Sequence, residues 1–151
     1  MPLQDRLIED LKDAMRKGDA LRRSVIRFAR AEIQNEEIAL QAGLDDDGVI
    51  KVLSRLAQQR RDSIEAFEKG GRDDLVEKEK AELAVVLGYL PEQLSRDEIV
   101  AAVKSSIEEI GATGPGDMGK VMGHVVPRVR GRAEGREVSA VAAELLKHLG
   151  G

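Results

Sequence analysis

The sequence predicts an all-α protein, and three observations lead to that prediction. Apolar residues recur every three or four positions through most of the 151 residues, which is the spacing of one face of an α-helix. The alternation of apolar and polar residues that is typical of a half-buried strand is nowhere sustained. Aromatic residues amount to only 2%, so the core must consist of Leu, Ile, Val and Ala, a composition that favours helices.

Four helices are expected in an N-terminal domain that spans residues 1–92. The first ends at Gly18, a typical C-terminal glycine, and the second follows Asp19, which can cap it. The third follows the acidic run 45–47, which suits a helix cap better than a calcium loop because the alternating ligands and the distant Glu are missing. The fourth is expected to end at Pro91.

A second, smaller domain is expected over residues 93–151. The segment 95–98, Ser-Arg-Asp-Glu, matches a capping box at the start of a helix. Pro127 is expected to kink or end the next helix, and Ser139 to cap the last one. The predicted architecture is therefore an N-terminal bundle of about four helices followed by a C-terminal three-helix unit.

Composition excludes several classes of protein. Hydrophobic residues make up 42% and charged residues 34% of the chain, which is too apolar for a disordered chain and too charged for a membrane protein. The absence of Cys excludes disulfides and thiolate catalysis. Residues 1–10 are charged rather than apolar, which argues against a secretory signal. These features predict a cytoplasmic location and no contact with membranes.

The segment 114–120, Gly-Pro-Gly-Asp-Met-Gly-Lys, has the spacing of a phosphate-binding loop, but the pattern fails at the next position. The loop needs Ser or Thr there to bind magnesium, and Val121 has no oxygen. The preceding segment is also helical rather than a buried strand. We interpret this stretch as a Gly-rich turn into a helix. Its backbone N–H groups, with Lys120, remain candidates to hold a phosphate of nucleic acid.

No catalytic residue, metal site or cofactor is predicted. His124 and His148 are the only histidines, and neither has a second ligand at metal-binding spacing. No serine lies in a G-x-S-x-G turn. Acidic pairs such as 108–109 have the pattern of ordinary solvated charges.

Basic residues are distributed unevenly, although the net charge is −4. Residues 1–110 hold 18 basic and 24 acidic side chains, while residues 111–151 hold six and four. Phosphate contacts give affinity without reading sequence, and the scarcity of aromatic residues disfavours stacking on single-stranded bases, so folded RNA is the expected ligand. A solvated charged face that binds nothing remains the alternative. The candidate nucleic-acid-binding residues are Lys120, His124, Arg128, Arg130, Arg132, Arg136, Arg23, Arg27 and Arg30.

Several strings resemble a known family. The segments 11–15, 59–64, 67–79, 89–91 and 117–122 are similar in sequence and order to the YqeY-like family. That family is similar to the tail of the B subunit of the glutamine-dependent aspartyl/glutamyl-tRNA amidotransferase. The resemblance implies an all-α fold and a C-terminal unit, containing segments 117–122 and 131–136, that approaches tRNA. Segment 131–136 has Arg where the family pattern has Lys, which keeps the charge.

These observations lead to the hypothesis of a non-catalytic tRNA-binding accessory protein without DNA specificity. One alternative is a helical adaptor that docks on an amidotransferase or an aminoacyl-tRNA synthetase. Another is a subunit-like protein associated with carbon–nitrogen ligase activity that uses glutamine as amide donor. The residues do not support autonomous ligase activity, because the resemblance covers only the tail of the B subunit and not its catalytic body.

Overall fold

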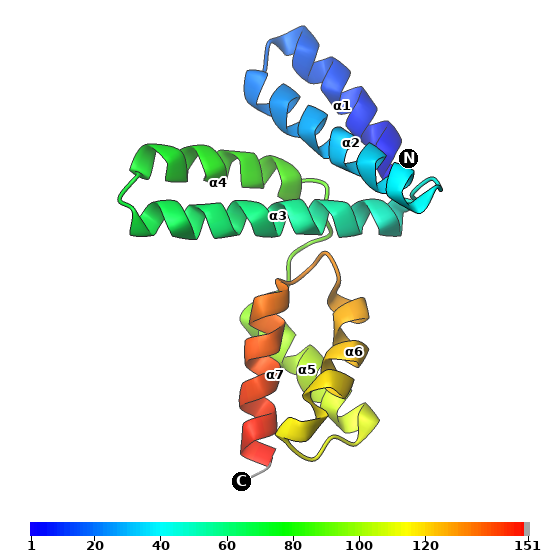
Figure 1. Ribbon diagram of the computed structural model, residues 1–151, viewed down its shortest axis with the longest axis vertical. Helices are drawn as coiled ribbons and strands as arrows, with labels where there is room; N and C mark the ends of the chain where they lie inside the picture. The colour runs from blue at the N-terminus through cyan, green and yellow to red at the C-terminus, as the bar shows by residue number, and fades with distance from the viewer. Residues whose placement is uncertain (150–151) are drawn as a thin grey trace. The chain divides into compact units, whose positions relative to one another are not determined.

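The computed structural model describes residues 1–149, which form seven α-helices and one short 3-10 helix and contain no β-strand (Figure 1). This confirms the all-α prediction. The chain divides into two compact units, called unit 1 (Met1–Pro91) and unit 2 (Glu92–Gly151) below. No helix within residues 1–149 has both the length and the apolar character needed to cross a bilayer. The elements are α1 (Leu3–Lys17), α2 (Ala20–Leu40), α3 (Asp46–Lys69), α4 (Asp73–Leu87), α5 (Arg96–Ile110), the 3-10 turn η1 (Pro115–Asp117), α6 (Met118–Val129) and α7 (Gly135–Leu149).

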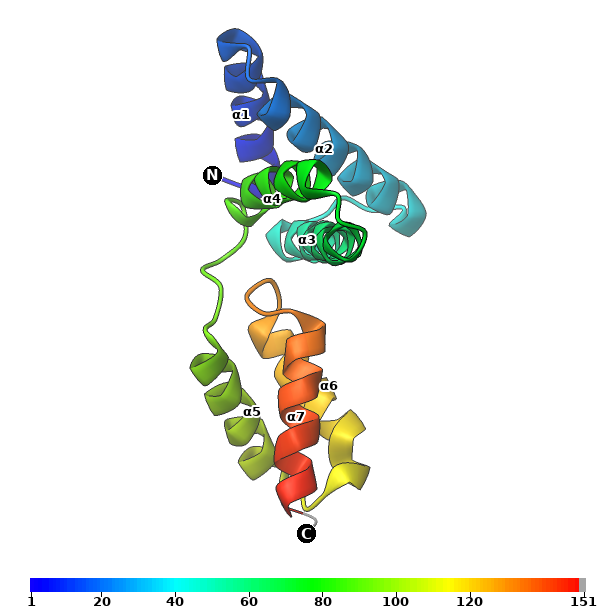
Figure 2. The same ribbon diagram turned by 90° about the vertical axis from the view of Figure 1, so that its left-hand side faces the viewer.

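Unit 1 consists of two helical hairpins, α1 with α2 and α3 with α4, which cross each other (Figures 1 and 2). The first hairpin turns at Gly18, whose left-handed backbone (φ 68°) is the conformation predicted for a C-terminal glycine. Asp19 caps α2, as predicted, by accepting a hydrogen bond from the backbone N–H of Arg22 at 3.1 Å. The fully buried side chains at the centre of the unit include Leu7, Ile26, Ile33, Val49 and Leu53.

Two residues of the acidic run 45–47 accept backbone hydrogen bonds at the start of α3. Asp45 Oδ1 accepts a hydrogen bond from the Gly48 N–H at 2.9 Å, which confirms the cap interpretation. Asp46 Oδ1 accepts one from the Leu3 N–H at 2.9 Å and so ties the start of α1 to the start of α3.

The fourth helix ends earlier than predicted. It stops at Leu87 rather than at Pro91, and the N–H groups of Tyr89 and Leu90 bond three residues back, to Val86 and Leu87. The residue that precedes a proline is disfavoured in the helical conformation, so Leu90 cannot extend the helix.

Tyr89 fastens the end of α4 to α1. Its side chain is buried, its hydroxyl donates a 2.5 Å hydrogen bond to Asp10 Oδ2, and the guanidinium of Arg6 lies 4.6 Å from the ring centroid. Burial raises the pKa of the Tyr89 hydroxyl far above its ordinary value, and the hydrogen bond to Asp10 acts in the same direction. The hydroxyl therefore keeps its proton in the folded state at alkaline pH.

Changing Tyr89 to Phe should weaken the pH dependence of stability in alkaline solution. In the unfolded chain tyrosine loses its proton near pH 10, whereas folded Tyr89 keeps it. Ionisation therefore stabilises only the unfolded chain, and the contribution of Tyr89 to the free energy of unfolding falls as the pH rises above about 10. The stability gap between wild type and Tyr89→Phe should narrow by about 1 kcal/mol between about pH 9 and about pH 11. Urea denaturation of both proteins at the two pH values measures this difference in the free energy of unfolding, and a difference that does not change with pH would contradict the expectation.

Unit 2 consists of α5, α6 and α7, each in contact with the other two. Its fully buried side chains include Ile99, Val103, Val121, Val125 and Leu146. The predicted capping box is present: Ser95 Oγ accepts from the Glu98 N–H at 3.2 Å, and Glu98 Oε1 accepts from the Ser95 N–H at 3.0 Å.

Two predictions for unit 2 need correction, the first of them in part. Of the two expected effects of Pro127, a kink or an end, the end is wrong: α6 continues to Val129, because a proline so close to a helix end removes only one hydrogen bond late in the ladder. Ser139 does not cap the last helix but lies inside it. The Val138 N–H bonds to the carbonyl of Glu134 at 3.1 Å, which places the start of α7 five residues earlier than a cap at the serine would.

Changing Ser95 to Ala should lower the free energy of unfolding by about 1 kcal/mol, because the Glu98 N–H loses its acceptor. The matched control is Ser105→Ala, an exposed position inside the same helix, where Ala should be neutral or slightly stabilising. Urea denaturation compares the two variants, and equal stabilities would contradict the role of the cap.

Candidate nucleic-acid interface

The exposed face of α6 carries two of the predicted basic residues at its two ends. Val121, Val125 and Val129 are buried against α5 and α7, so the opposite face of the helix points to solvent. Lys120 is 80% exposed at the start of this face. Arg130 is exposed directly after the last residue of α6, and its side chain makes no hydrogen bond or ion pair within the described part of the chain.

The Gly-rich segment before α6 is a turn, as interpreted from the sequence. Residues 115–117 form η1, and the Asp117 carboxylate accepts a 2.9 Å hydrogen bond from the Thr113 N–H. That hydrogen bond is the main cause of a lowered pKa of Asp117, so the carboxylate is ionised at neutral pH. Its negative charge lies 4.0 Å from Lys120 Nζ and opposes a phosphate at this turn. The turn is therefore unsuited to act as a phosphate-binding loop, whereas the long side chain of Lys120 is exposed.

His124 and Arg128 are directed toward α5 instead of lying free on a basic face. The Glu109 carboxylate lies 2.9 Å from His124 Nε2 and 3.4 Å from Arg128 Nη2. Arg128 also contacts the imidazole ring and donates a 3.2 Å hydrogen bond to the carbonyl oxygen of His124. Glu109 is thus a partner of two predicted RNA-binding residues rather than the ordinary solvated charge that its sequence context indicated.

Ser106, His124 and Glu109 form an arrangement that the sequence did not indicate. Ser106 Oγ lies 2.7 Å from His124 Nδ1, and Glu109 Oε2 lies on the other side of the ring. A serine, a histidine and an acid in line are the components of a nucleophilic site. Ser106 is only 1% exposed, however, so its hydroxyl cannot reach a substrate carbonyl. The three residues instead join α5 to α6, through a partly buried contact between Ser106 and His124 and a contact between His124 and Glu109, whose side chain is 55% exposed.

Arg132 lies in the connection between α6 and α7, and Arg136 lies at the start of α7. Arg132 Nε donates a 3.0 Å hydrogen bond to the carbonyl of Glu92, and the Arg132 carbonyl accepts one from the Leu94 N–H at 2.7 Å. Arg132 thus holds the segment before α5 in place. Arg136 is exposed in the first turn of α7.

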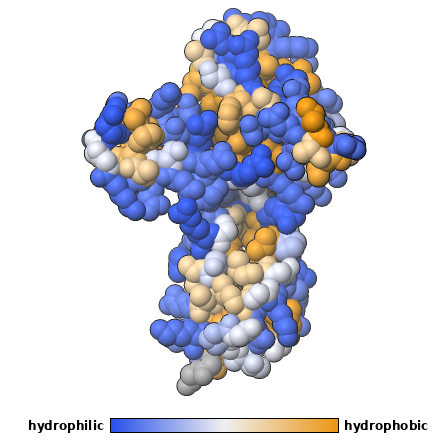
Figure 3. Space-filling model, in the orientation of Figure 1, coloured by the Kyte–Doolittle hydropathy of each residue, from blue (hydrophilic) through white to orange (hydrophobic). Residues whose placement is uncertain are grey.

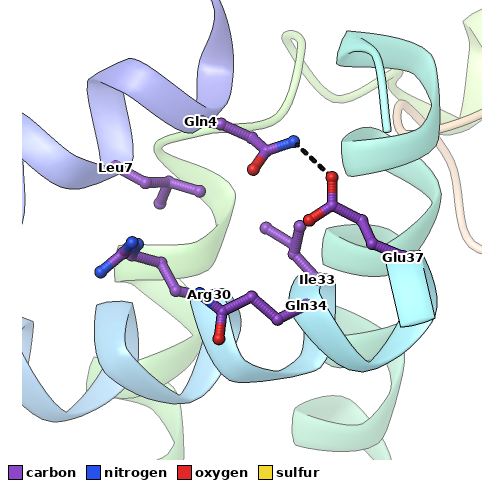
Figure 4. A pocket seen from close by; sticks show the side chains of 6 residues that line it. All are labelled: Gln4, Leu7, Arg30, Ile33, Gln34 and Glu37. Carbon is purple, nitrogen blue, oxygen red and sulfur yellow. Dashed lines mark hydrogen bonds between the residues drawn. The ribbon is translucent and has the colours of Figure 1, made fainter. Parts of the chain in front are cut away.

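The three predicted arginines of unit 1 lie along one side of α2, the side that faces α1. Arg27 Nη2 lies 3.9 Å from Met15 Sδ, and Arg30 lines a small pocket between the two helices (Figure 4). Arg23 and Arg30 are only partly exposed, and Glu37 puts a carboxylate at the far end of the pocket. Nearby Lys17 and Arg22 both pair with Asp13 at 3.1 Å. Arg23 and Arg30 are therefore less accessible than Lys120 and Arg130, whereas Arg27 is exposed.

Comparison with known proteins gives the family. The model of the family described as Yqey-like protein matches residues 4–146. "Altered inheritance of mitochondria protein 41, mitochondrial" of Lachancea thermotolerans is 39% identical over 112 residues, which cover 72% of this chain and 60% of that relative. The protein of the same name from Pyrenophora tritici-repentis is 36% identical over 130 residues, which cover 85% of this chain and 71% of that relative. The chain thus spans about three fifths of the length of the Lachancea relative.

These relatives contradict the cytoplasmic location predicted from the sequence, because they are named as mitochondrial proteins. The prediction used the lack of an apolar segment at residues 1–10, and that observation bears only on secretion. Since the family model matches nearly the whole chain, from residue 4 to residue 146, the chain belongs to the YqeY-like family.

Proposed function

We propose that this protein is a non-catalytic accessory protein that binds tRNA through the exposed face of α6. The observation that carries the proposal is the placement of Lys120 and Arg130 at the two ends of this face. They lie ten positions apart in the sequence, and Arg130 directly follows the last residue of α6, so about 15 Å along the helix axis separates them. The two side chains can therefore contact different phosphates along one RNA backbone.

The surface of α6 between Lys120 and Arg130 allows an RNA backbone to approach closely. A Cβ atom added at Gly119 or at Gly123 would meet no atom within 4 Å, so packing inside this chain does not require glycine there. Glycine inside a helix costs about 1 kcal/mol relative to alanine. The bare backbone lets a sugar-phosphate backbone come nearer than side chains would allow.

The side chains on and around α6 favour contacts with the phosphate backbone of a nucleic acid over contacts with its bases. Residues 114–136 contain no aromatic side chain, so bases have no stacking partner there and the phosphate backbone is the expected contact. The segment 117–122, which lies at the start of this face, is also one of the strings that resemble the YqeY-like family, and that family is similar to the amidotransferase tail. That resemblance favours tRNA over other folded RNAs.

The test is the binding of the full chain to total tRNA, measured by fluorescence anisotropy at about 50 mM and about 200 mM salt. Two to four phosphate contacts should make the affinity fall roughly ten- to a hundredfold over this range. A DNA duplex of similar length serves as the comparison, and it should bind more weakly because its shape differs. Absent or salt-insensitive tRNA binding would contradict the proposal.

A further inference from the structure

A groove lies at the end of unit 1 where α2 leads into α3. It has a volume of about 440 Å³, within the usual range of small-molecule pockets. Leu40, Leu44 and Val52 form its apolar part. Gly48 shapes it, because a Cβ atom there would lie 2.9 Å from Leu44 Cδ2 and would push the leucine away from α3.

Apolar side chains are exposed at this end of the unit. Leu40, which lines the groove, is 58% exposed, and neighbouring Ile38 is 74% exposed. Figure 3 shows apolar surface at the end of unit 1 where α2 gives way to α3. Exposed aliphatic side chains beside a groove are the anchor points that a partner segment covers.

The rim of the groove is acidic. Glu36, Asp45 and Asp47 line it together with Lys51 and Arg55. The Arg55 guanidinium is already held by Glu32 at 3.4 Å and by Glu36 at 3.8 Å. Asp47 is exposed and has no polar side-chain partner among the residues that the structure describes. The rim thus holds three carboxylates against two cations, one of which is already neutralised, and this balance favours a positively charged occupant over a phosphate.

We propose that this groove binds a basic amphipathic helix of a partner protein. An aliphatic side chain of the partner enters between Leu40, Leu44 and Val52, and its Lys or Arg side chains pair with the rim carboxylates. The groove is thus a protein-binding site in unit 1, independent of the RNA contact proposed for unit 2. Charge complementarity selects this occupant over RNA, and the apolar lining selects it over a purely polar basic segment.

The first experiment uses the full, isotopically labelled chain and a designed Leu/Lys peptide that forms an amphipathic helix. Titration should shift the amide NMR signals of residues 36–55. A Leu/Glu peptide of the same pattern should not bind, and neither should a scrambled Leu/Lys peptide that lacks an apolar face. Shifts centred elsewhere, or equal binding of the acidic peptide, would overturn the proposal.

Two variants sharpen the test. Leu40→Ser should weaken binding about tenfold, because the loss of one buried aliphatic contact has that size. Its control, Leu21→Ser, changes an exposed leucine at the other end of α2 and should leave binding unchanged. Asp47→Lys should weaken binding mainly at low salt. Asp73→Lys, which changes an exposed acid in the first turn of α4, controls for net charge.

Two outcomes would assign the groove to another occupant and so overturn the proposal. One is a concentration-dependent dimer in analytical ultracentrifugation that Leu40→Ser abolishes, which would make a second copy of this chain the occupant. The other is a shift of the same amide signals by tRNA. Equal effects of Leu40→Ser and Leu21→Ser on peptide binding would also contradict it.

Discussion

Replacing Arg60 with Ala is expected to lower the free energy of unfolding of unit 1 by about 3–5 kcal/mol. Arg60, on α3, places Nη1 3.2 Å from Glu79 Oε2 and 2.8 Å from Glu82 Oε2, both on α4. The two acidic side chains are only 14% and 11% exposed. Without the guanidinium they would remain as two uncompensated carboxylates in a partly buried site. The variant also loses the contact of Arg60 with the Phe28 ring, whose centroid lies 5.6 Å away.

Arg55→Ala is the matched control for this prediction. Arg55 is also an arginine of α3 paired with glutamates, but its side chain is 47% exposed, so its loss should cost less than about 1 kcal/mol. Urea denaturation followed by circular dichroism compares the two variants. The triple variant with Arg60→Met, Glu79→Gln and Glu82→Gln should recover much of the lost stability, since it leaves no buried charge unpaired. Equal losses for Arg60→Ala and Arg55→Ala would refute the explanation.

Changing both Lys120 and Arg130 to Glu is expected to lower the affinity for tRNA by roughly a hundredfold at low salt. Each change removes one phosphate contact and adds a repulsive charge, so the slope of log affinity against log salt should fall by about two. Fluorescence anisotropy over a salt series measures both quantities. Circular dichroism should show an unchanged fold, since both side chains are exposed.

The matched control is the pair Lys104→Glu and Lys147→Glu, which changes the net charge by the same amount at exposed positions of α5 and α7. It should reduce tRNA affinity much less. A single Arg128→Ala should also weaken binding less than Arg130→Ala, because Arg128 is already paired with Glu109. An equal loss in both double variants would mean that net charge, rather than the α6 face, determines binding.

The local signals of the sequence correctly predicted much of the fold. Gly18, Asp45 and the capping box of Ser95 and Glu98 act as predicted. Each is decided by hydrogen bonds between residues only a few positions apart, which a sequence pattern contains directly. Ser139 misled for the same reason, because a serine four residues inside a helix has the same local pattern as a cap.

Local patterns could not predict which basic side chains are free to bind a ligand and which are paired within the protein. The sequence places Lys120, His124, Arg128 and Arg130 in one basic segment, but the packing of α5 against α6 brings Glu109 to His124 and Arg128 and leaves Arg130 exposed. Whether a cation is free depends on which face of its helix meets which face of a neighbour. That contact joins residues far apart in the chain. The sequence by itself therefore determined where the helices form, through the spacing of apolar residues, whereas tertiary packing alone decided which charged side chains are paired.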